Sequence, residues 1–223
     1  MKPSITYLPF LLLCITYSNT LLCSSTAADP LSSQPEAVVD TLGRPVKFGD
    51  YFYYIKPADK TGKYPGGGLG LRGIQGNMSD SSCPLCVVQE TIELRDGLAM
   101  QFYPVNKPDD GIIRVDTDLN IQFAFPDTCN QPTVWRLQKT KGKWFVNLGG
   151  EIGNPGPETV SNWFKFLKTG KSKEGYNKYL ILYCPMSVCR SCNVVCKNVG
   201  IVMQNGKRRL GLAKKPYEIV FES

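Results

Sequence analysis

Cysteine is the residue type with the widest range of chemistry in this chain, and histidine is absent. The 223 residues include nine cysteines and no histidine. Without histidine there can be no Ser-His-Asp triad, no Cys-His nucleophile pair and no metal site that needs an imidazole ligand. Most hydrolase mechanisms are therefore excluded, and we expect a protein that is not an enzyme and that binds no metal and no cofactor.

The first 28 residues have the pattern of a secretory signal peptide. Lys2 precedes an apolar run over residues 7–17, and small residues occupy positions 24–28. This pattern predicts cleavage after Ala27 or Ala28 and a single mature domain over residues 29–223. The apolar run is shorter than the ~20 residues that a membrane-spanning helix needs, so we expect no membrane partner.

Removal of this peptide leaves an odd number of cysteines. Seven remain in the mature chain: Cys83, Cys86, Cys129, Cys184, Cys189, Cys192 and Cys196. In a secreted protein they predict disulfide bonds with one thiol left over. The last four also have spacings used by zinc sites and redox enzymes, but we favour disulfides because the secretory compartment oxidises thiols and no βαβ pattern surrounds them.

Because N-glycans are added to proteins on the secretory route, one sequon in this chain is a candidate glycosylation site. It is Asn77-Met78-Ser79, and it lies in a polar stretch. A glycosylated asparagine must be exposed, so we expect a glycan at Asn77 on a surface loop.

The chain is basic, with a formal charge of +7 from 26 Lys and Arg against 19 Asp and Glu. The basic residues are scattered, and the densest stretch is Lys207, Arg208 and Arg209, followed by Lys214 and Lys215. No nucleic-acid-binding motif accompanies them. We therefore interpret them as a solvated basic surface and expect no nucleic-acid partner.

The elements that must position these residues are short strands. Apolar and β-branched runs recur along the chain, separated by Gly, Pro, Asn and Asp, and no helices are visible between them. This pattern predicts an all-β barrel or sandwich. The expected strands cover residues 37–39, 51–55, 87–89, 98–102, 112–115, 121–125, 134–137, 144–148, 179–183, 201–203, 209–212 and 219–221.

One segment fits two periodicities. Val160, Trp163, Phe164 and Leu167 stand at helical spacing, whereas residues 164–166 alternate as in a strand. We favour a strand because the neighbouring segments are strands.

A glycine run at residues 66–68, with Gly70 beyond it, has the composition of a phosphate-binding loop. No Gly-Lys-Ser/Thr ending follows it, so we interpret it as a tight connection in which glycine allows positive φ.

Several unusual strings occur in one order and together carry a family resemblance. They are VVD at 38–40, YYI at 53–55, GGGL at 66–69, CPLCVVQ at 83–89, IRVDTDLNI at 113–121, TVWRL at 133–137, GNPGPET at 153–159, CP at 184–185, VGI at 199–201 and RRLGL at 208–212. From about residue 37 to residue 221 the chain resembles the plant Kunitz inhibitors of the soybean trypsin inhibitor type, in their miraculin-like branch.

The resemblance implies a β-trefoil: twelve strands in three repeats near residues 36–90, 91–150 and 151–221, with six strands in a barrel and three capping hairpins. It also implies the disulfides Cys83–Cys129, Cys184–Cys196 and Cys189–Cys192. Cys86 is then left over, as a buried free thiol, an intermolecular bridge or a rival partner for Cys129. The protein is accordingly expected to be a monomer or a Cys86-linked dimer.

The family's reactive loop corresponds to residues 102–111. Pro104 matches a proline two residues ahead of the residue that enters the protease specificity pocket (P1), which places Asn106 at P1, with Lys107 as the alternative if the register shifts by one. Inhibitors directed at trypsin carry Arg or Lys at P1, because the pocket ends in an aspartate. Inhibitory relatives also brace the loop with an asparagine side chain, where this chain has Phe48 and Gly49.

The resemblance therefore implies a secreted endopeptidase inhibitor that blocks a serine protease, with cysteine or aspartic proteases as further candidate targets. The alternative is a non-inhibitory defence, storage or binding protein of the miraculin-like type on the same fold. A taste-modifying switch is disfavoured because acid sensing near neutral pH relies on histidine. We expect the apoplast as the location, with the vacuole as the alternative.

Overall fold

Short strands account for most of the regular structure in this computed structural model, which describes residues 34–61, 64–75, 83–124 and 129–223. The expected signal peptide at residues 1–28 and the sequon at Asn77 lie outside the described residues. The chain from Pro35 to Ser223 forms one compact unit.

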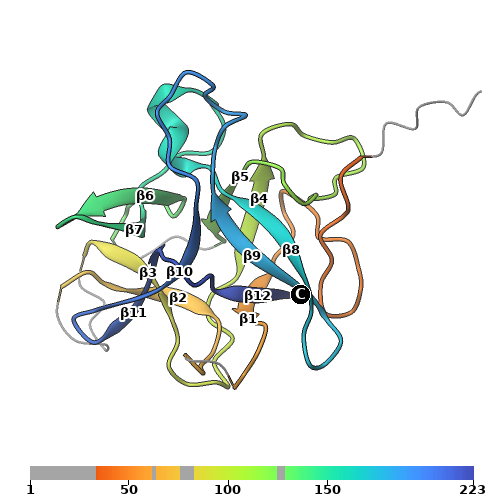
Figure 1. Ribbon diagram of the computed structural model, residues 1–223, viewed down its shortest axis with the longest axis horizontal. Coiled ribbons are helices and arrows are strands. Elements are labelled where there is room, and N and C mark those ends of the chain that lie inside the picture. Colours follow the sequence, from red (N-terminus) through yellow and green to blue (C-terminus); the bar gives the residue numbers. More distant parts are fainter. Residues whose placement is uncertain (1–33, 62–63, 76–82, 125–128) are drawn as a thin grey trace, which may run out of the picture. The chain divides into compact units, whose positions relative to one another are not determined.

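Twelve strands and one short helix are present in the described residues, which confirms the all-β class (Figure 1). Two of the expected strands, at residues 37–39 and 112–115, form isolated bridges instead, and β2 was not expected. The elements are β1 (Tyr54–Pro57), β2 (Leu69–Gly73), β3 (Leu85–Gln89), β4 (Met100–Pro104), β5 (Leu119–Phe123), β6 (Trp135–Thr140), β7 (Lys143–Leu148), the 3-10 helix η1 (Pro157–Asn162), β8 (Lys165–Lys171), β9 (Asn177–Tyr183), β10 (Lys197–Gln204), β11 (Lys207–Leu212) and β12 (Glu218–Glu222).

Six of the strands close a barrel. Antiparallel pairings join β12 to β1, β4 to β5, β8 to β9 and β9 to β12. Single bridges complete the ring, one between Tyr53, beside β1, and Met100 of β4, and one between Leu119 of β5 and Phe164, beside β8. A closed ring leaves no free sheet edge between its strands.

The other six strands form three hairpins, β2–β3, β6–β7 and β10–β11. The second strand of each hairpin, β3, β7 or β11, pairs with the second strands of the other two hairpins. The paired residues are Arg209 with Val88, Gly211 with Phe145, and Cys86 with Asn147. Each of the expected repeat spans contains one hairpin. A six-stranded barrel with three hairpins arranged around one axis is the β-trefoil that the resemblance implied.

The barrel interior shows the same threefold pattern. Phe102, Phe166 and Phe221 come from β4, β8 and β12, the strand that follows each hairpin, and all three are fully buried. Their ring centroids lie 5.3, 5.6 and 4.9 Å apart, with edge-to-face geometry. Large aromatic rings in this arrangement contribute contact energy beyond their buried area.

The ambiguous segment divides between two structures. Val160 lies in η1, so the strand expected there is wrong, whereas Leu167 lies in β8. Pro157 begins the 3-10 turn, and the Thr159 hydroxyl donates to the Asn154 carbonyl at 2.5 Å. Trp163 returns to an extended conformation, and the strand starts two residues later.

The glycine run serves close packing, which corrects the expectation of positive φ. None of Gly66, Gly67 and Gly68 has positive φ. A Cβ at these positions would lie 2.3, 2.1 and 1.9 Å from the carbonyl oxygens of Glu90, Arg95 and Asp96. Only glycine allows the two backbone segments to approach so closely.

The basic stretch of β11 is also corrected, because two of its three members are buried. Lys207 has no exposed surface, and its Nζ donates to the carbonyl oxygens of Gly73 and Gln75. Arg209 is 2% exposed and stacks on Phe145 at 4.2 Å. Strand alternation turns these side chains inward, so the sequence cluster is not a surface patch.

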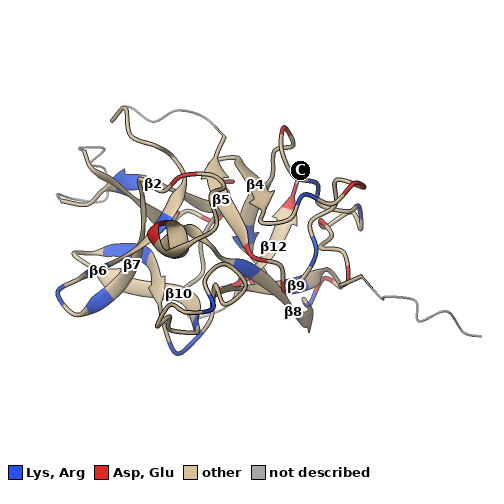
Figure 2. Ribbon diagram, turned by 90° about the horizontal axis from the view of Figure 1, so that it is seen from above, with Lys and Arg blue, Asp and Glu red and all other residues tan. Residues whose placement is uncertain are grey.

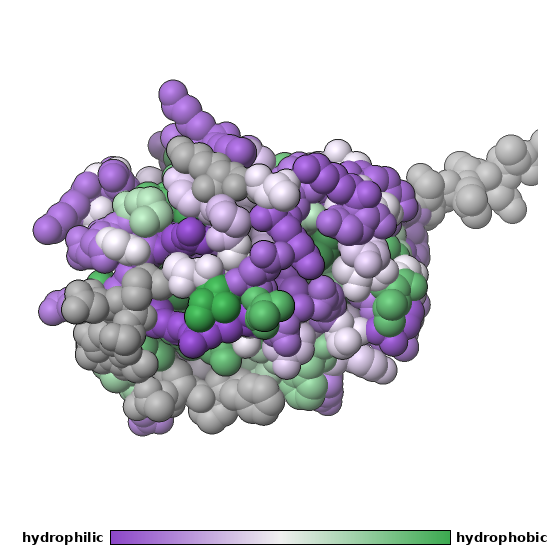
Figure 3. Space-filling view, turned by 90° about the horizontal axis from the view of Figure 1, so that it is seen from below, coloured by the Kyte–Doolittle hydropathy of each residue, from purple (hydrophilic) through white to green (hydrophobic). Residues whose placement is uncertain are grey.

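The face seen from below in Figure 3 is mainly hydrophilic, with hydrophobic residues in small groups. The most exposed large hydrophobic residue of the described chain is Leu94, at 91%, in the loop after β3. Ile92 and Leu98 in the same connection are 50% and 40% exposed. Apolar atoms make up much of the surface of any folded domain, so this exposure alone does not indicate a binding site.

Candidate functional site

The expected reactive loop connects β4 to β5 and lies at the upper right of Figure 1, in light green. Pro104 ends β4 and is buried, paired with Leu119. Val105 N donates to the Asp118 carbonyl at 2.8 Å and closes the base of the loop. The two ends of the loop are therefore joined by main-chain bonds that do not involve its tip.

A second brace comes from the segment before β1. Lys47 bridges Ile112, Phe48 N donates to the Gly111 carbonyl at 3.0 Å, and Gly49 N donates to the Phe102 carbonyl at 3.2 Å. The Phe48 side chain packs against the core instead of hydrogen-bonding the loop. The main chain around Phe48 thus supports the loop as well.

Asp110 orders the descending half of the loop. Its Oδ1 accepts a hydrogen bond from Ile112 N at 3.0 Å, and its other oxygen pairs with the Arg114 guanidinium. Arg114 also donates to the Pro35 carbonyl at 3.2 Å. We did not identify these two residues from the sequence, although opposite charges four residues apart on either side of Gly111 are a readable signal.

The tip consists of Asn106 and Lys107, and both are exposed. Neither side chain forms a hydrogen bond or an ion pair within the described part of the chain. Pro104 and Pro108 flank them and restrict the backbone on both sides. The tip is thus a short exposed stretch held between two fixed supports.

Beneath the loop lies a buried carboxylate that the sequence did not indicate. Asp118 is 1% exposed, and burial raises its pKa, while a hydrogen bond from Ser187 and the charge of Lys165, 3.6 Å away, act in the opposite direction. Ser187 belongs to the disulfide-bonded loop between β9 and β10. Asp118 therefore connects the base of the candidate loop to that second loop.

Three disulfides join Cys83 with Cys129, Cys184 with Cys196, and Cys189 with Cys192. These are the pairs that the resemblance implied.

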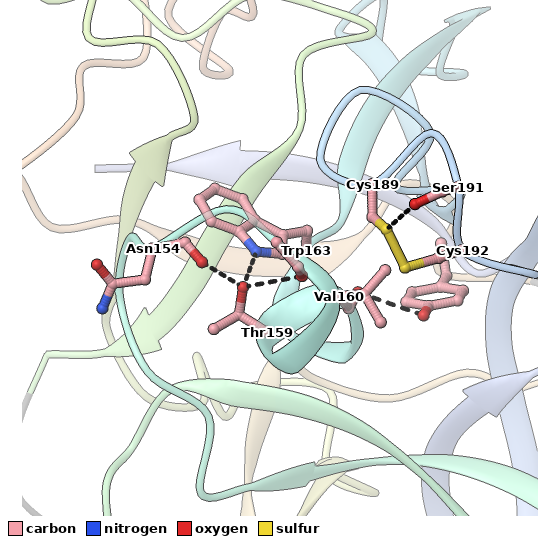
Figure 4. The surroundings of a disulfide bond; sticks show 9 residues. Asn154, Thr159, Val160, Trp163, Cys189, Ser191 and Cys192 are labelled. Atoms are coloured by element: carbon pink, nitrogen blue, oxygen red, sulfur yellow. Dashed lines mark hydrogen bonds between the residues drawn. A yellow bond between two sulfur atoms is a disulfide. The ribbon is translucent and has the colours of Figure 1, made fainter.

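The loop that contains two of the disulfides lies beside η1 (Figure 4). The Tyr183 hydroxyl donates to the Val160 carbonyl at 3.3 Å, and Trp163 Nε1 donates to the Thr159 hydroxyl at 3.2 Å. No group of three or more Cys, Asp or Glu side chains in the described residues could hold a metal ion. The four clustered cysteines are paired with one another as disulfides.

A family model described as trypsin and protease inhibitor matches residues 38–223. The chain belongs to the Kunitz family of trypsin and protease inhibitors. Miraculin from Synsepalum dulcificum is 40% identical over 205 residues, covering 87% of this chain and 88% of that protein. Kunitz trypsin inhibitor 5 from Arabidopsis thaliana is 36% identical over 217 residues, covering 96% and 95%.

The Kunitz fold is supported by solved structures as well. A Kunitz-type cysteine protease inhibitor from potato superposes with a TM-score of 0.68 at 29% identity, covering 84% of this chain and 97% of that structure.

Within the described residues, no helix has the length and apolar character needed to cross a bilayer.

The unpaired cysteine of this Kunitz chain is enclosed in the sheet. Cys86 has no exposed surface, and its Sγ lies 3.3 Å from the Arg72 carbonyl. Burial raises the pKa of the thiol, and the charges of Arg209, Lys207 and Arg72 partly offset that effect. Of the three states expected for Cys86, the structure has the buried free thiol, and a bridge between two copies would require the sheet to open.

Proposed function

We propose that the protein inhibits a serine endopeptidase by presenting residues 104–111 as a rigid loop, with Asn106 entering the specificity pocket. The observation that carries this proposal is the combination of an exposed tip with a base braced from both sides. Such a loop loses little conformational entropy when it docks, so contact energy is retained as affinity.

The same braces explain how a substrate-like loop can inhibit. If the protease cuts the bond after Asn106, the Val105–Asp118 and Phe48–Gly111 hydrogen bonds hold both new ends in place. The ends remain positioned for resealing, and product release is slow. Family membership supports this role for the fold, while the particular protease depends on the tip.

The chemistry of Asn106 favours a protease whose pocket has no buried aspartate. A neutral amide cannot neutralise the carboxylate at the base of a trypsin pocket. Lys107 has the required charge, but Pro108 would then follow the cut bond and hinder its approach. We therefore expect weak inhibition of trypsin and stronger inhibition of a serine protease that accepts a small polar side chain.

The test measures inhibition constants for the oxidised mature protein against trypsin, chymotrypsin, subtilisin, papain and pepsin, with mass spectrometry to locate cleavage. Submicromolar inhibition of a serine protease with one slow cut after Asn106 is the expected result. Inhibition of papain that persists in Asn106→Ala would instead assign a cysteine protease and another surface. No inhibition of any protease would contradict the proposal.

A second candidate is a non-inhibitory defence, storage or binding protein. It is favoured by the identity to miraculin and by the absence of a side-chain brace at Phe48. Saturable binding of a protein or glycan that is unaffected by Asn106→Ala and Lys107→Ala, without protease inhibition, would establish it. In either role we propose a secreted monomer that acts in the apoplast, with the vacuole as the alternative, and that catalyses no reaction itself.

A further inference from the structure

The excess positive charge of the chain is concentrated in two segments that lie together in the fold. Residues 129–150 contain four Lys and Arg and no Asp or Glu, and residues 179–217 contain seven and again none. The first segment includes the β6–β7 hairpin and the second the β10–β11 hairpin, and Gly211 pairs with Phe145 between them. Figure 2 shows the basic residues on the β6–β7 hairpin.

A groove of about 720 Å³ lies where these hairpins meet. Its rim carries three exposed lysines: Lys143 at the start of β7, Lys197 at the start of β10 and Lys214 after β11. None of the three forms an ion pair with a described residue, whereas lysines elsewhere, such as Lys56 and Lys178, each contact two carboxylates. We call this feature the lysine-rimmed groove.

The floor of the lysine-rimmed groove is apolar. Trp144, Ile201 and Leu212 line it and pack partly against the core, and Met203 beside them is 46% exposed. Lys139 Nζ lies 5.8 Å from the centre of the Trp144 ring and adds a fourth positive charge nearby. No acidic residue lines the groove.

We propose that the lysine-rimmed groove binds an acidic segment of a partner protein, in which Asp or Glu residues flank an aliphatic or aromatic side chain. Unpaired lysines around the rim supply charge complementarity, which guides association and register. The apolar floor favours a hydrophobic side chain, whereas a fully hydrated sulfated glycan would make contact mainly with the lysines. None of residues 104–111 lines the groove, so this site is separate from the candidate protease-binding loop.

The test uses the mature protein and a fluorescein-labelled peptide, Glu-Glu-Leu-Phe-Glu-Glu, followed by fluorescence anisotropy. Two comparison peptides replace the glutamates with glutamine, or Leu-Phe with Ser-Ser. We expect each replacement to weaken binding about tenfold or more, because charge and apolar contact both contribute. Raising the salt concentration should also weaken binding of the parent peptide, because salt screens the attraction between its glutamates and the lysines.

Matched double variants separate the groove from overall charge. Lys143→Gln/Lys214→Gln removes two groove lysines, and Lys171→Gln/Lys173→Gln removes two exposed lysines on the β8–β9 hairpin. The first variant should raise the Kd about fivefold to tenfold, and the second by less than about twofold.

Tryptophan fluorescence supplies a local readout on the unlabelled peptide. The chain has three tryptophans, of which Trp135 and Trp163 are buried and Trp144 lines the groove. Peptide binding should therefore change emission in the parent protein but not in Trp144→Phe.

Three outcomes would overturn the proposal. The first is equal weakening by the two double variants, which would assign binding to net charge alone. The second is binding of the Ser-Ser peptide as tight as that of the parent, or tighter binding of a heparin hexasaccharide or phosphatidylserine vesicles with the same lysine dependence, because either would make the occupant a polyanion. The third is no binding of the parent peptide at low salt.

Discussion

Replacing Asn106 with arginine should convert the loop into a trypsin inhibitor. The Asn106 side chain is exposed and has no partner among the described residues, so Asn106→Arg should change the free energy of unfolding by less than about 0.5 kcal/mol. In the complex, the new guanidinium would pair with the aspartate in the trypsin pocket. Removing one partner of a desolvated charge pair at an interface costs about 2–5 kcal/mol of binding free energy. Supplying the missing partner should therefore increase the affinity about 30-fold to a few thousand-fold.

The assay measures trypsin inhibition constants and, by mass spectrometry, the ratio of intact to cleaved inhibitor over several hours. Lys107→Arg is the matched control, since it introduces the same group one position away and should leave trypsin inhibition unchanged. If Lys107→Arg tightens inhibition and Asn106→Arg does not, the register is wrong. If the Asn106→Arg protein is cut rapidly and releases active trypsin, the loop is not rigid enough and the preorganisation argument fails.

The same variant tests the role of Asp110. In Asn106→Arg/Asp110→Ala, the loop loses the hydrogen bond to Ile112 N and the ion pair with Arg114. Both interactions are at least partly exposed, so together they should contribute about 1–2 kcal/mol to loop order. Trypsin inhibition should weaken about fivefold to 30-fold relative to Asn106→Arg alone, and faster cleavage should accompany the loss.

Three further predictions concern stability and the thiol. Cys86 should not react with a thiol reagent in the native protein and should give one reactive thiol in denaturant, because it is buried and its pKa is raised; reaction of the native protein within minutes would contradict this. Burial raises the pKa of Asp40, but hydrogen bonds from Arg44 and other groups outweigh it and lower the pKa below the ordinary 3.8. The Asp40 carboxylate therefore stabilises the fold fully above that pH, and this stabilisation is lost as the pH falls through the lowered pKa of the folded state. Asp40→Asn should cost about 1–2 kcal/mol at pH 6 in urea unfolding, and the difference from the parent protein should shrink steadily as the medium is made more acidic than pH 3.8. Cys83→Ser/Cys129→Ser opens a disulfide with a sequence separation of 46 and should cost about 4 kcal/mol by the loop-entropy relation; a loss under about 1 kcal/mol would show that the unfolded chain is not constrained by this bond.

Local sequence patterns predicted most strands correctly and failed at particular places. β2 was missed because Leu69–Gly73 reads LGLRG, with two glycines and no β-branched residue, and its pairing with β3 supplies the stability that propensity does not. At residues 160–167, two periodicities overlapped, and the packing of η1 against its neighbours decided where the strand begins.

The candidate site shows the same division. Asn106 and Lys107 were placed at the tip by the resemblance, and the structure exposes both. The braces at Phe48 and Gly49 are main-chain bonds to residues more than 50 positions away, which no side-chain pattern reveals. The sequence around Asp118 gives no sign that this residue differs from an ordinary surface carboxylate. Its burial and its hydrogen bond from Ser187 arise only from the tertiary fold.

The sequence by itself determined the all-β class, the lack of histidine chemistry, the cysteine inventory and the residues at the loop tip, since these depend on composition and short strings. Tertiary structure decided which strands close the barrel, that Lys207 and Arg209 lie inside while Lys143, Lys197 and Lys214 surround a groove, and that Cys86 is enclosed. The physical reason is that each of these depends on pairings such as Tyr54 with Glu222 and Arg209 with Val88. Pairings over such sequence distances set which face of a strand is buried, and local periodicity carries no information about the partner.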